Sequence, residues 1–248
     1  MILGLPAGLV AAGLLAALVA GVVRGLAGFG LAILLVPLLG LVATPQEAVV
    51  ATNWLAVFTG LFGFSRVIRE AERSAFPIAA LAMLATPLGV VLLGLVPPAP
   101  ARLAIALIAI AAFAAILMPP RAAGHRPSAA ETGATGIAAG LLTGFAGMPG
   151  PPVVPYYLRR TLPPATARSS MLVVFFAAAL AGGCTALAIG AAHGRSALLA
   201  LALWPMVVIG NWLGFRLHDR VSPRVWRIVT GATLGAAALV AAVKLAMA

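Results

Sequence analysis

Charged residues are scarce in this sequence, and their scarcity excludes a soluble globular protein. Only 8% of the 248 residues are Asp, Glu, Lys or Arg, whereas 63% are hydrophobic. About a quarter of the residues of a soluble domain are charged, so too few polar side chains remain here to cover a water-exposed surface. Because a bilayer-spanning helix needs about 20 apolar residues, the length suffices for about ten spans. We therefore expect an all-α polytopic membrane protein with about 8–10 transmembrane helices.

Acidic residues are the rarest of the charged ones, with five Asp and Glu against 16 Lys and Arg. In a soluble protein this excess would suggest a nucleic-acid partner, but here the basic residues lie between apolar stretches, where they determine membrane topology. We therefore expect a lipid bilayer around the protein and no nucleic-acid partner. The lack of carboxylates within the spans also disfavours a cation site, which usually needs several carboxylate or carbonyl oxygens.

Residues for catalysis and metal binding are few. The one cysteine, Cys184, cannot form an intramolecular disulfide, and its apolar neighbours predict a small buried side chain. The three histidines, His125, His193 and His218, lie in or beside expected loops without metal-ligand spacing. The sequence has no G-x-S-x-G motif and no nucleotide-binding fingerprint. These features argue against an enzyme and predict no cofactor and no metal.

Apolar stretches separated by Gly, Pro and basic residues divide the chain into two sets of five. The first set is 3–23, 31–43, 48–64, 76–96 and 102–118, and the second is 136–145, 151–158, 166–189, 197–215 and 225–247. A polar stretch separates the sets. We therefore expect a first transmembrane repeat over residues 1–118, a cytoplasmic linker over 119–132 and a second repeat over 133–248.

The two sets resemble each other at an offset of about 119 residues. Residues 24–30 (Arg-Gly-Leu-Ala-Gly-Phe-Gly), followed by Pro37, are answered by residues 143–150 (Thr-Gly-Phe-Ala-Gly-Met-Pro-Gly), followed by Pro155. A duplicated unit of five segments is the simplest account. An odd number of spans per unit inverts the second copy, and the basic loops agree, because an inverted second copy places them all on the cytoplasmic side.

Glycines and prolines interrupt the apolar stretches at matching places in the two repeats. Irregular backbone at membrane depth must be buried in protein or line a cavity, because lipid offers it no hydrogen bonds. Broken helices at equivalent places in inverted repeats are typical of a transporter's midplane site, where half-helix N-termini point N–H groups at an anion. The alternative is that these glycines only allow helices to pack closely.

Several polar residues near the breaks could bind an anion. Arg24 could be a counter-charge for the substrate or an anchor at the membrane interface, and the same two interpretations hold for Arg168. Asn53 carries an amide that needs partners in an apolar environment, as does Asn211, whereas threonine and serine hydroxyls often bond only to a helix carbonyl. The candidate substrate-binding residues are Arg24, Gly28, Phe29, Gly30, Thr52, Asn53, Thr143, Gly147, Met148, Gly150, Arg168, Ser169 and Ser170.

Glu47 is the one acid near an apolar segment, so it is a candidate for proton coupling. It follows Thr44 and Pro45 in the pattern of a capping box, however, and this structural role explains it without function. We favour the cap.

The duplicated motif and its following prolines resemble the sulfite exporter (TauE/SafE-type) family of membrane permeases over nearly the whole chain. Two departures stand out: Leu31 and Ala32 follow Gly30 where the family often has more glycines, and the second copy reads Met-Pro-Gly-Pro-Pro over residues 148–152.

The resemblance implies a multi-pass protein of the bacterial inner membrane that exports sulfite, a sulfonate or a related organosulfur anion. The expected mechanism is secondary transport by alternating access, and a transporter or channel for another small anion or solute is the alternative. A homodimer is compatible with the sequence, which does not fix the oligomeric state.

Overall fold

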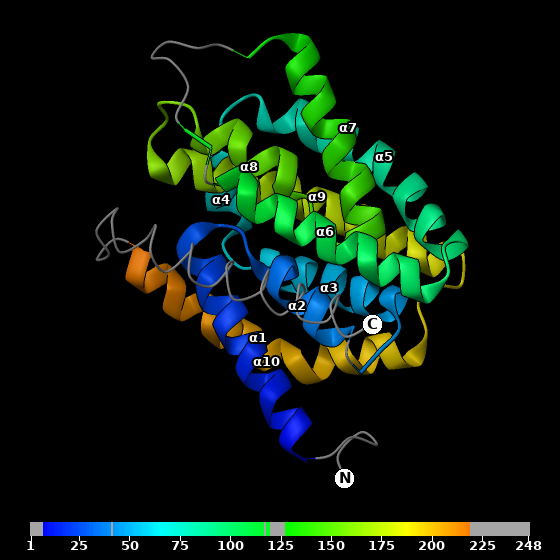
Figure 1. Cartoon of the computed structure of the whole chain (residues 1–248). Coiled ribbons are helices and arrows are strands. Elements are labelled where there is room, and N and C mark those ends of the chain that lie inside the picture. Colours follow the sequence, from blue (N-terminus) through cyan, green and yellow to red (C-terminus); the bar gives the residue numbers. More distant parts are fainter. Residues whose placement is uncertain (1–6, 41, 117, 120–126, 219–248) are drawn as a thin grey trace.

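The computed structural model describes residues 7–40, 42–116, 118–119 and 127–218, and every regular element in this part is a helix (Figure 1). The last expected segment, 225–247, lies outside the described residues. The helices are α1 Ala7–Ala27, α2 Leu31–Leu39, α3 Pro45–Gly60, α4 Phe64–Glu70, α5 Ala75–Leu95, α6 Pro98–Ile116, α7 Ala129–Ala146, α8 Gly150–Leu158, α9 Pro164–Ala188 and α10 Gly194–His218.

Four of these helices, α1, α5, α9 and α10, are long and apolar enough to cross a membrane. The helices α3 and α4 together form a fifth candidate span, with a bend of 83° between them. By contrast, α2 and α8 have nine residues each, or about 13 Å at 1.5 Å per residue, so neither crosses a hydrocarbon core of about 30 Å. The described part of the chain therefore contains four or five candidate spans, fewer than the number expected for the whole sequence.

Three expectations about local structure are wrong. The region expected to be a loop after residue 64 contains α4, which begins after Gly63, a residue in the left-handed conformation. The helix α7 begins inside the expected linker, because the Ser128 side chain accepts a hydrogen bond from the Glu131 N–H and caps it. Cys184 is exposed, and an apolar thiol on the outer face of a helix costs little where the surroundings are lipid.

Helix starts recur along the described chain. The pairs α2 and α8, α3 and α9, and α5 and α10 each begin 119 residues apart, the offset found in the sequence. One difference is that the first unit is bent at Gly63 between α3 and α4, whereas α9 continues without interruption over 25 residues.

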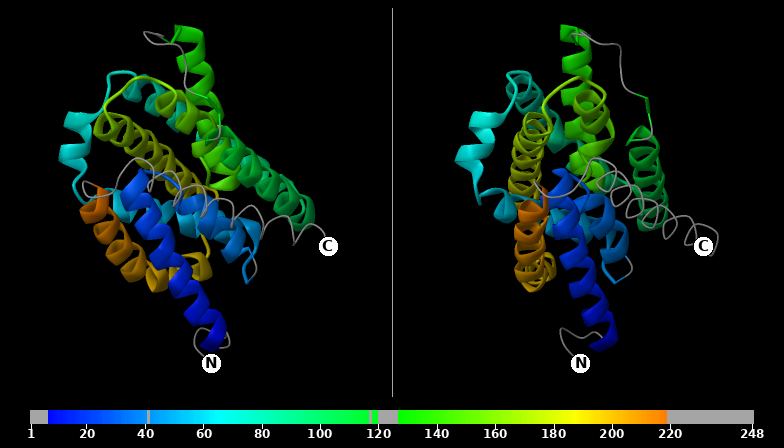
Figure 2. Two further views of the ribbon diagram at one scale, coloured as in Figure 1. Left: turned by 60° about the vertical axis from the view of Figure 1, so that its left-hand side comes forward. Right: turned by 90° about the vertical axis from the view of Figure 1, so that its left-hand side faces the viewer.

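Long helices of one half pack against long helices of the other. The helix α1 lies along α10, as both views of Figure 2 show, and α5 lies along α7. Glycines allow both approaches: a Cβ atom on Gly25 would overlap the Asn211 carbonyl, and one on Gly144 would overlap the Thr86 carbonyl. Each contact between the halves thus depends on an equivalent glycine, since Gly25 and Gly144 are 119 residues apart.

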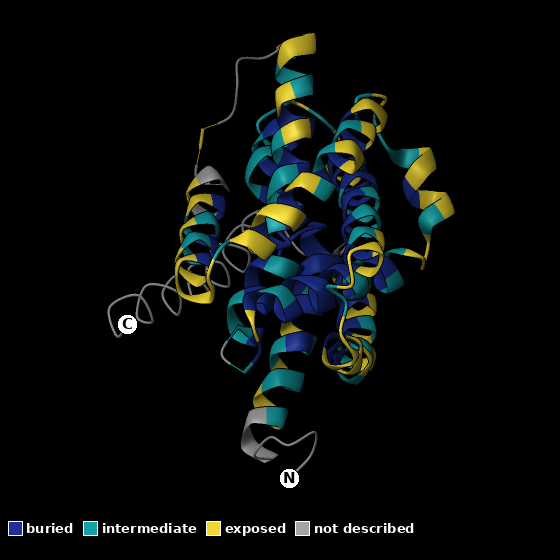
Figure 3. Ribbon diagram, turned by 90° about the vertical axis from the view of Figure 1, so that its right-hand side faces the viewer, coloured by how far each residue is buried: buried dark blue, intermediate teal, exposed yellow. Residues whose placement is uncertain are grey.

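Buried residues gather around the short helices at the centre, and exposed residues lie at the periphery (Figure 3). Many peripheral side chains are large and apolar, such as Leu84, which is 77% exposed, and Leu95, which is 75% exposed. An apolar outer surface of this kind fits lipid rather than water.

Candidate functional site

The first helix break lies between α1 and α2 and depends on two glycines. Gly28 and Gly30 have φ angles of 85° and 101°, in the left-handed region that glycine adopts most easily. Neither position has room for a side chain, because a Cβ atom would lie 2.7 Å from Arg168 Cγ at Gly28 and 2.7 Å from Val23 Cγ1 at Gly30. These residues turn the chain sharply and start α2 inside the protein.

The second break lies between α7 and α8 and is built differently. Gly147 has a φ angle of 69°, and its N–H donates to carbonyl groups of the last turn of α7. The Met148 N–H also donates to the Leu142 carbonyl, at 3.2 Å, in the pattern of a glycine helix cap. Pro149 then leads directly into α8.

The two breaks face a common cavity of about 470 Å³, a volume that includes its open mouth. Helices α3 and α9 complete its wall. The cavity brings together nine of the candidate residues, namely Arg24, Gly28, Phe29, Gly30, Asn53, Thr143, Gly147, Met148 and Gly150. It is also lined by Leu31, Ala32, Ile33, Ala56, Pro149, Phe175 and Ala179.

Arg24 supplies a buried positive charge to this cavity. Its residue is 5% exposed, and Nη1 donates a 2.9 Å hydrogen bond to Oδ1 of Asn211 on α10. Among the described residues, no carboxylate lies within ion-pair distance of Arg24. A buried charge normally has a partner of opposite sign, so an anion in the cavity would supply what the protein does not.

Asn53 contributes an amide nitrogen that has no hydrogen-bond partner in the described part of the chain. The residue is 2% exposed, and its Nδ2 atom forms no hydrogen bond with the described residues. The amide lies directly over Gly182 of α9, where a Cβ atom would be 2.6 Å from Nδ2. A buried unpartnered donor costs about 1–3 kcal/mol, and an acceptor atom of a ligand would remove this cost.

The first turn of α2 offers further donors. The earliest amide there to bond within the turn is that of Leu34, which donates to the Gly30 carbonyl at 3.2 Å, and Gly30 provides no side-chain cap. The amides of Leu31, Ala32 and Ile33 donate to none of the residues that the structure describes. Free amides at a helix N-terminus, together with the helix dipole, favour an anion.

Four candidate residues lie outside the cavity lining. The hydroxyl groups of Thr52 and Ser170 donate to the helix carbonyls of Ala48 and Thr166, at 2.8 Å and 2.7 Å, and this is the alternative weighed for such hydroxyls. Ser169 donates to Glu70 at 3.0 Å. The fourth, Arg168, is described below.

Arg168 supports the first break rather than lining the cavity. Its Nη2 atom donates to the Gly25 carbonyl, and its guanidinium lies 3.7 Å from the centre of the Phe215 ring. It therefore holds the end of α1 from the side of α9 and α10. Thr143 lines the cavity, but its hydroxyl donates to the Ala139 carbonyl at 2.6 Å and is not a free donor.

Glu47 forms the expected capping box. Its Oε2 accepts hydrogen bonds from the Thr44 N–H at 2.8 Å and from the Thr44 hydroxyl at 3.1 Å, while the Glu47 N–H donates to Thr44 Oγ1. The structural explanation of Glu47 is confirmed. Proton coupling by this residue stays a prediction.

Sequence reasoning missed the apolar part of the cavity wall. Ala56, Phe175 and Ala179 line the cavity, but a search for polar donors passes over such residues. Helical spacing is the signal that could have found them: Ala56 follows Asn53 by three residues on the same face of α3, and Phe175 is its counterpart 119 residues later.

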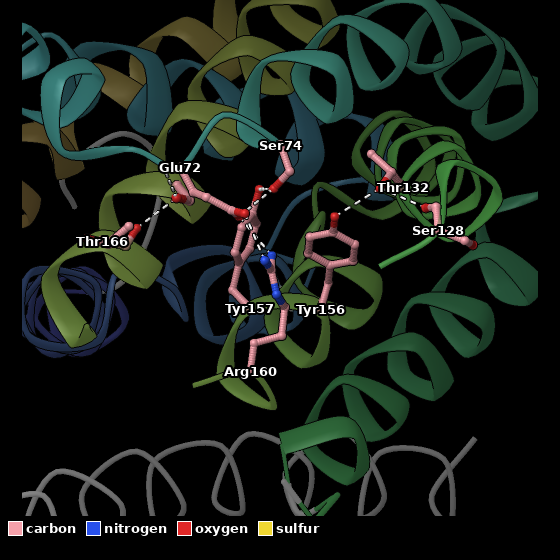
Figure 4. A network of polar contacts seen from close by, with 9 residues as sticks. Glu72, Ser74, Ser128, Thr132, Tyr156, Tyr157, Arg160 and Thr166 are labelled. Atoms are coloured by element: carbon pink, nitrogen blue, oxygen red, sulfur yellow. Dashed lines mark hydrogen bonds and ion pairs between the residues drawn. The ribbon is translucent and has the colours of Figure 1, made fainter. Parts of the chain in front are cut away.

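A separate polar cluster ties the α4–α5 connection to α8 and α9 (Figure 4). Arg160 binds both carboxylate oxygens of Glu72 at 2.8 Å, Ser74 donates to Glu72 at 2.6 Å, and the Ser74 and Tyr157 hydroxyls are 3.1 Å apart. Burial raises the pKa of Glu72, but the hydrogen bonds from Arg160 and Ser74 outweigh it and the pKa lies below its usual value. The same pairing raises the pKa of Arg160.

The described part of the chain thus has the long apolar helices of a multi-pass membrane protein, two short helices that begin inside the protein, and a buried arginine at a central cavity. Residues 13–241 match the family described as Sulfite exporter TauE/SafE. The chain therefore belongs to the sulfite exporter TauE/SafE family, a family of membrane transporters, and its apolar helices agree with a multi-pass membrane protein. No curated protein and no solved structure matches the chain.

Proposed function

We propose that this protein is a secondary transporter that exports a small sulfur-containing anion, such as sulfite or a sulfonate, across the bacterial inner membrane. The observation that carries the proposal is the buried Arg24, which lines the cavity between the two helix breaks and has no carboxylate partner among the described residues. Family membership supports sulfur oxyanions as the substrate class.

The donor set favours an anion over a neutral solute or a cation. Arg24 offers N–H donors and a full charge, Asn53 offers an unpartnered N–H group, and the first turn of α2 offers backbone N–H groups. Oxygen atoms of an oxyanion accept hydrogen bonds from all of these groups, and charge-assisted bonds are the strongest. The described lining contains no carboxylate that a metal ion could use.

Alternating access would follow from two inverted repeats, 1–118 and 133–248, that rock around the cavity. Two observations support this arrangement: the helix starts recur at 119 residues, and α1 packs on α10 as α7 packs on α5. Export would need no dedicated proton carrier, because a membrane potential that is negative inside drives an anion outward, by about 2.3 kcal/mol per charge per 100 mV.

Flux measurements in liposomes test the proposal. Purified protein is reconstituted, and saturable flux of sulfite, methanesulfonate and chloride is compared between the parent and Arg24→Gln. We expect flux of a sulfur oxyanion that falls at least tenfold in the variant, because a charge-assisted contact is worth about 1.5–3 kcal/mol. Arg195→Gln is the matched control, since Arg195 is exposed and donates to the Val42 carbonyl.

Two results would contradict the proposal. Folded parent protein that moves none of the sulfur anions would exclude this substrate class, and chloride flux alone would favour a transporter or channel for another anion. Equal flux in the parent and in folded Arg24→Gln would show that Arg24 does not bind the transported anion.

A further inference from the structure

We infer that the anion is bound mainly on one side of the cavity, by the first break and α3, and that the second break forms a wall with fewer hydrogen-bond donors. This inference rests on the proposed function and specifies which residues of the same site carry affinity. It follows from comparing residues 119 positions apart, since helices α2 and α8, and α3 and α9, start at that offset.

The charged position is present once. Arg24 corresponds to Thr143, whose hydroxyl is already bonded to the Ala139 carbonyl. The partner of Arg24 is compared by contact instead: Gly25 lies against Asn211 at the α1–α10 crossing, and the equivalent Gly144 lies against Thr86 at the α5–α7 crossing. The Thr86 hydroxyl donates to the Ala82 carbonyl at 2.6 Å, so the second side offers neither a charge nor a free hydroxyl.

The N-terminal turns of α2 and α8 also differ in their number of N–H donors. In α2 the first three residues, Leu31, Ala32 and Ile33, line the cavity, and their N–H groups have no partner in the described part of the chain. The corresponding residues of α8 are Gly150, Pro151 and Pro152, and proline has no N–H group. Among its first three residues α8 therefore has one N–H donor, where α2 has three.

The amide on α3 supplies a second, independent observation. Asn53 is 2% exposed, lines the cavity and has an Nδ2 atom without a partner among the described residues. Its counterpart on α9 is Leu172, which offers no donor. At three separate places the first half therefore provides more donors than the second half.

Substitutions that copy a residue from one half into the equivalent position of the other half test the inference. The measured quantity is the KM for flux of sulfite and of methanesulfonate in liposomes. Ala32→Pro copies the α8 sequence into α2 and removes one N–H group, at a position in the first turn where proline is tolerated. We expect KM to rise about tenfold, the effect of one hydrogen bond to a charged group. Pro151→Ala adds an N–H group to α8 and should leave KM within twofold of the parent.

Asn53→Leu keeps the test decisive if Ala32→Pro does not fold. This variant copies Leu172 and removes a buried unpartnered donor, so thermal stability should stay equal to the parent or rise while KM increases about tenfold. An effect of Pro151→Ala on KM as large as that of Ala32→Pro, or a parental KM in folded Asn53→Leu, would overturn the one-sided site. Absence of saturable flux in the parent would instead overturn the proposed function itself, and the inference with it.

Discussion

At the scale of the residue, glycine has two separable roles in this protein. Gly63 and Gly28 both adopt positive φ angles, of 74° and 85°. A side chain at Gly63 would meet nothing within 4 Å, whereas one at Gly28 would lie 2.7 Å from the Arg168 side chain. Conformation alone therefore requires glycine at the start of α4, but conformation and space both require it at the cavity.

Substituting these two glycines separates the roles. Gly63→Ala should lower stability by about 1–2 kcal/mol through backbone conformation, and flux should persist. Gly28→Ala should cost about 1–3 kcal/mol more, because Arg168 must move, and should also reduce flux. Thermal unfolding in detergent, with flux in liposomes, measures both effects. Equal stability losses in the two variants would mean that the Arg168 side chain can move aside without a cost in folding free energy.

At the scale of the element, the cluster of Glu72, Ser74, Tyr157 and Arg160 links the short helix α8 to the start of α5. The Ser170 hydroxyl accepts a hydrogen bond from the Glu72 N–H at 2.8 Å, which adds α9 to the link. Because α8 has nine residues and a helix this short is only marginally stable on its own, these contacts determine the position of its C-terminal end.

Glu72→Gln should lower stability at neutral pH by about 1–2 kcal/mol, as expected for a partly exposed, hydrogen-bonded ion pair. The folded-state pKa of Glu72 is depressed, so its contribution is present above the unfolded-state pKa of about 4.3 and is lost as the pH falls through the folded-state pKa. The difference in unfolding temperature between parent and variant should therefore shrink below about pH 4.

Arg66→Gln is the control for this element, because Arg66 forms an exposed pair with Glu70 four residues away in the same helix. Such pairs contribute about 0.3–0.5 kcal/mol. If Arg66→Gln destabilised the protein as much as Glu72→Gln, the cluster would have no special part in holding α8.

At the scale of the whole molecule, the helix breaks and the repeat could be predicted from the sequence, but the pairs of helices that pack together could not. The breaks at Gly28 and Gly147 follow from local glycine spacing, and the 119-residue recurrence is visible in the sequence itself. The pairing of α1 with α10 is not, because a glycine in an apolar helix does not indicate which helix approaches it. The start of α7 was missed for a local reason, since the capping signal of Ser128 lies within a polar stretch.

The inverted repeats that we propose predict that equivalent points of the two halves lie on opposite sides of the membrane. Arg73 and His193 are exposed and lie just before α5 and α10. In a Cys184→Ala background, His193→Cys should react with a membrane-impermeant maleimide in intact cells, and Arg73→Cys only after permeabilisation, because arginine-rich loops stay in the cytoplasm. Labelling of both from the same side would exclude inverted repeats.

The packing of α1 in the first half against α10 in the second half has a consequence for biosynthesis. The residues that follow α1 must be synthesised up to Gly194 before α10 can begin to cover Gly25 and bring Asn211 to Arg24. At about 5–20 residues per second, the ribosome needs on the order of ten to thirty seconds for this stretch. During that interval Arg24 lacks its amide partner, so the contact that buries its charge forms only after α10 has been synthesised.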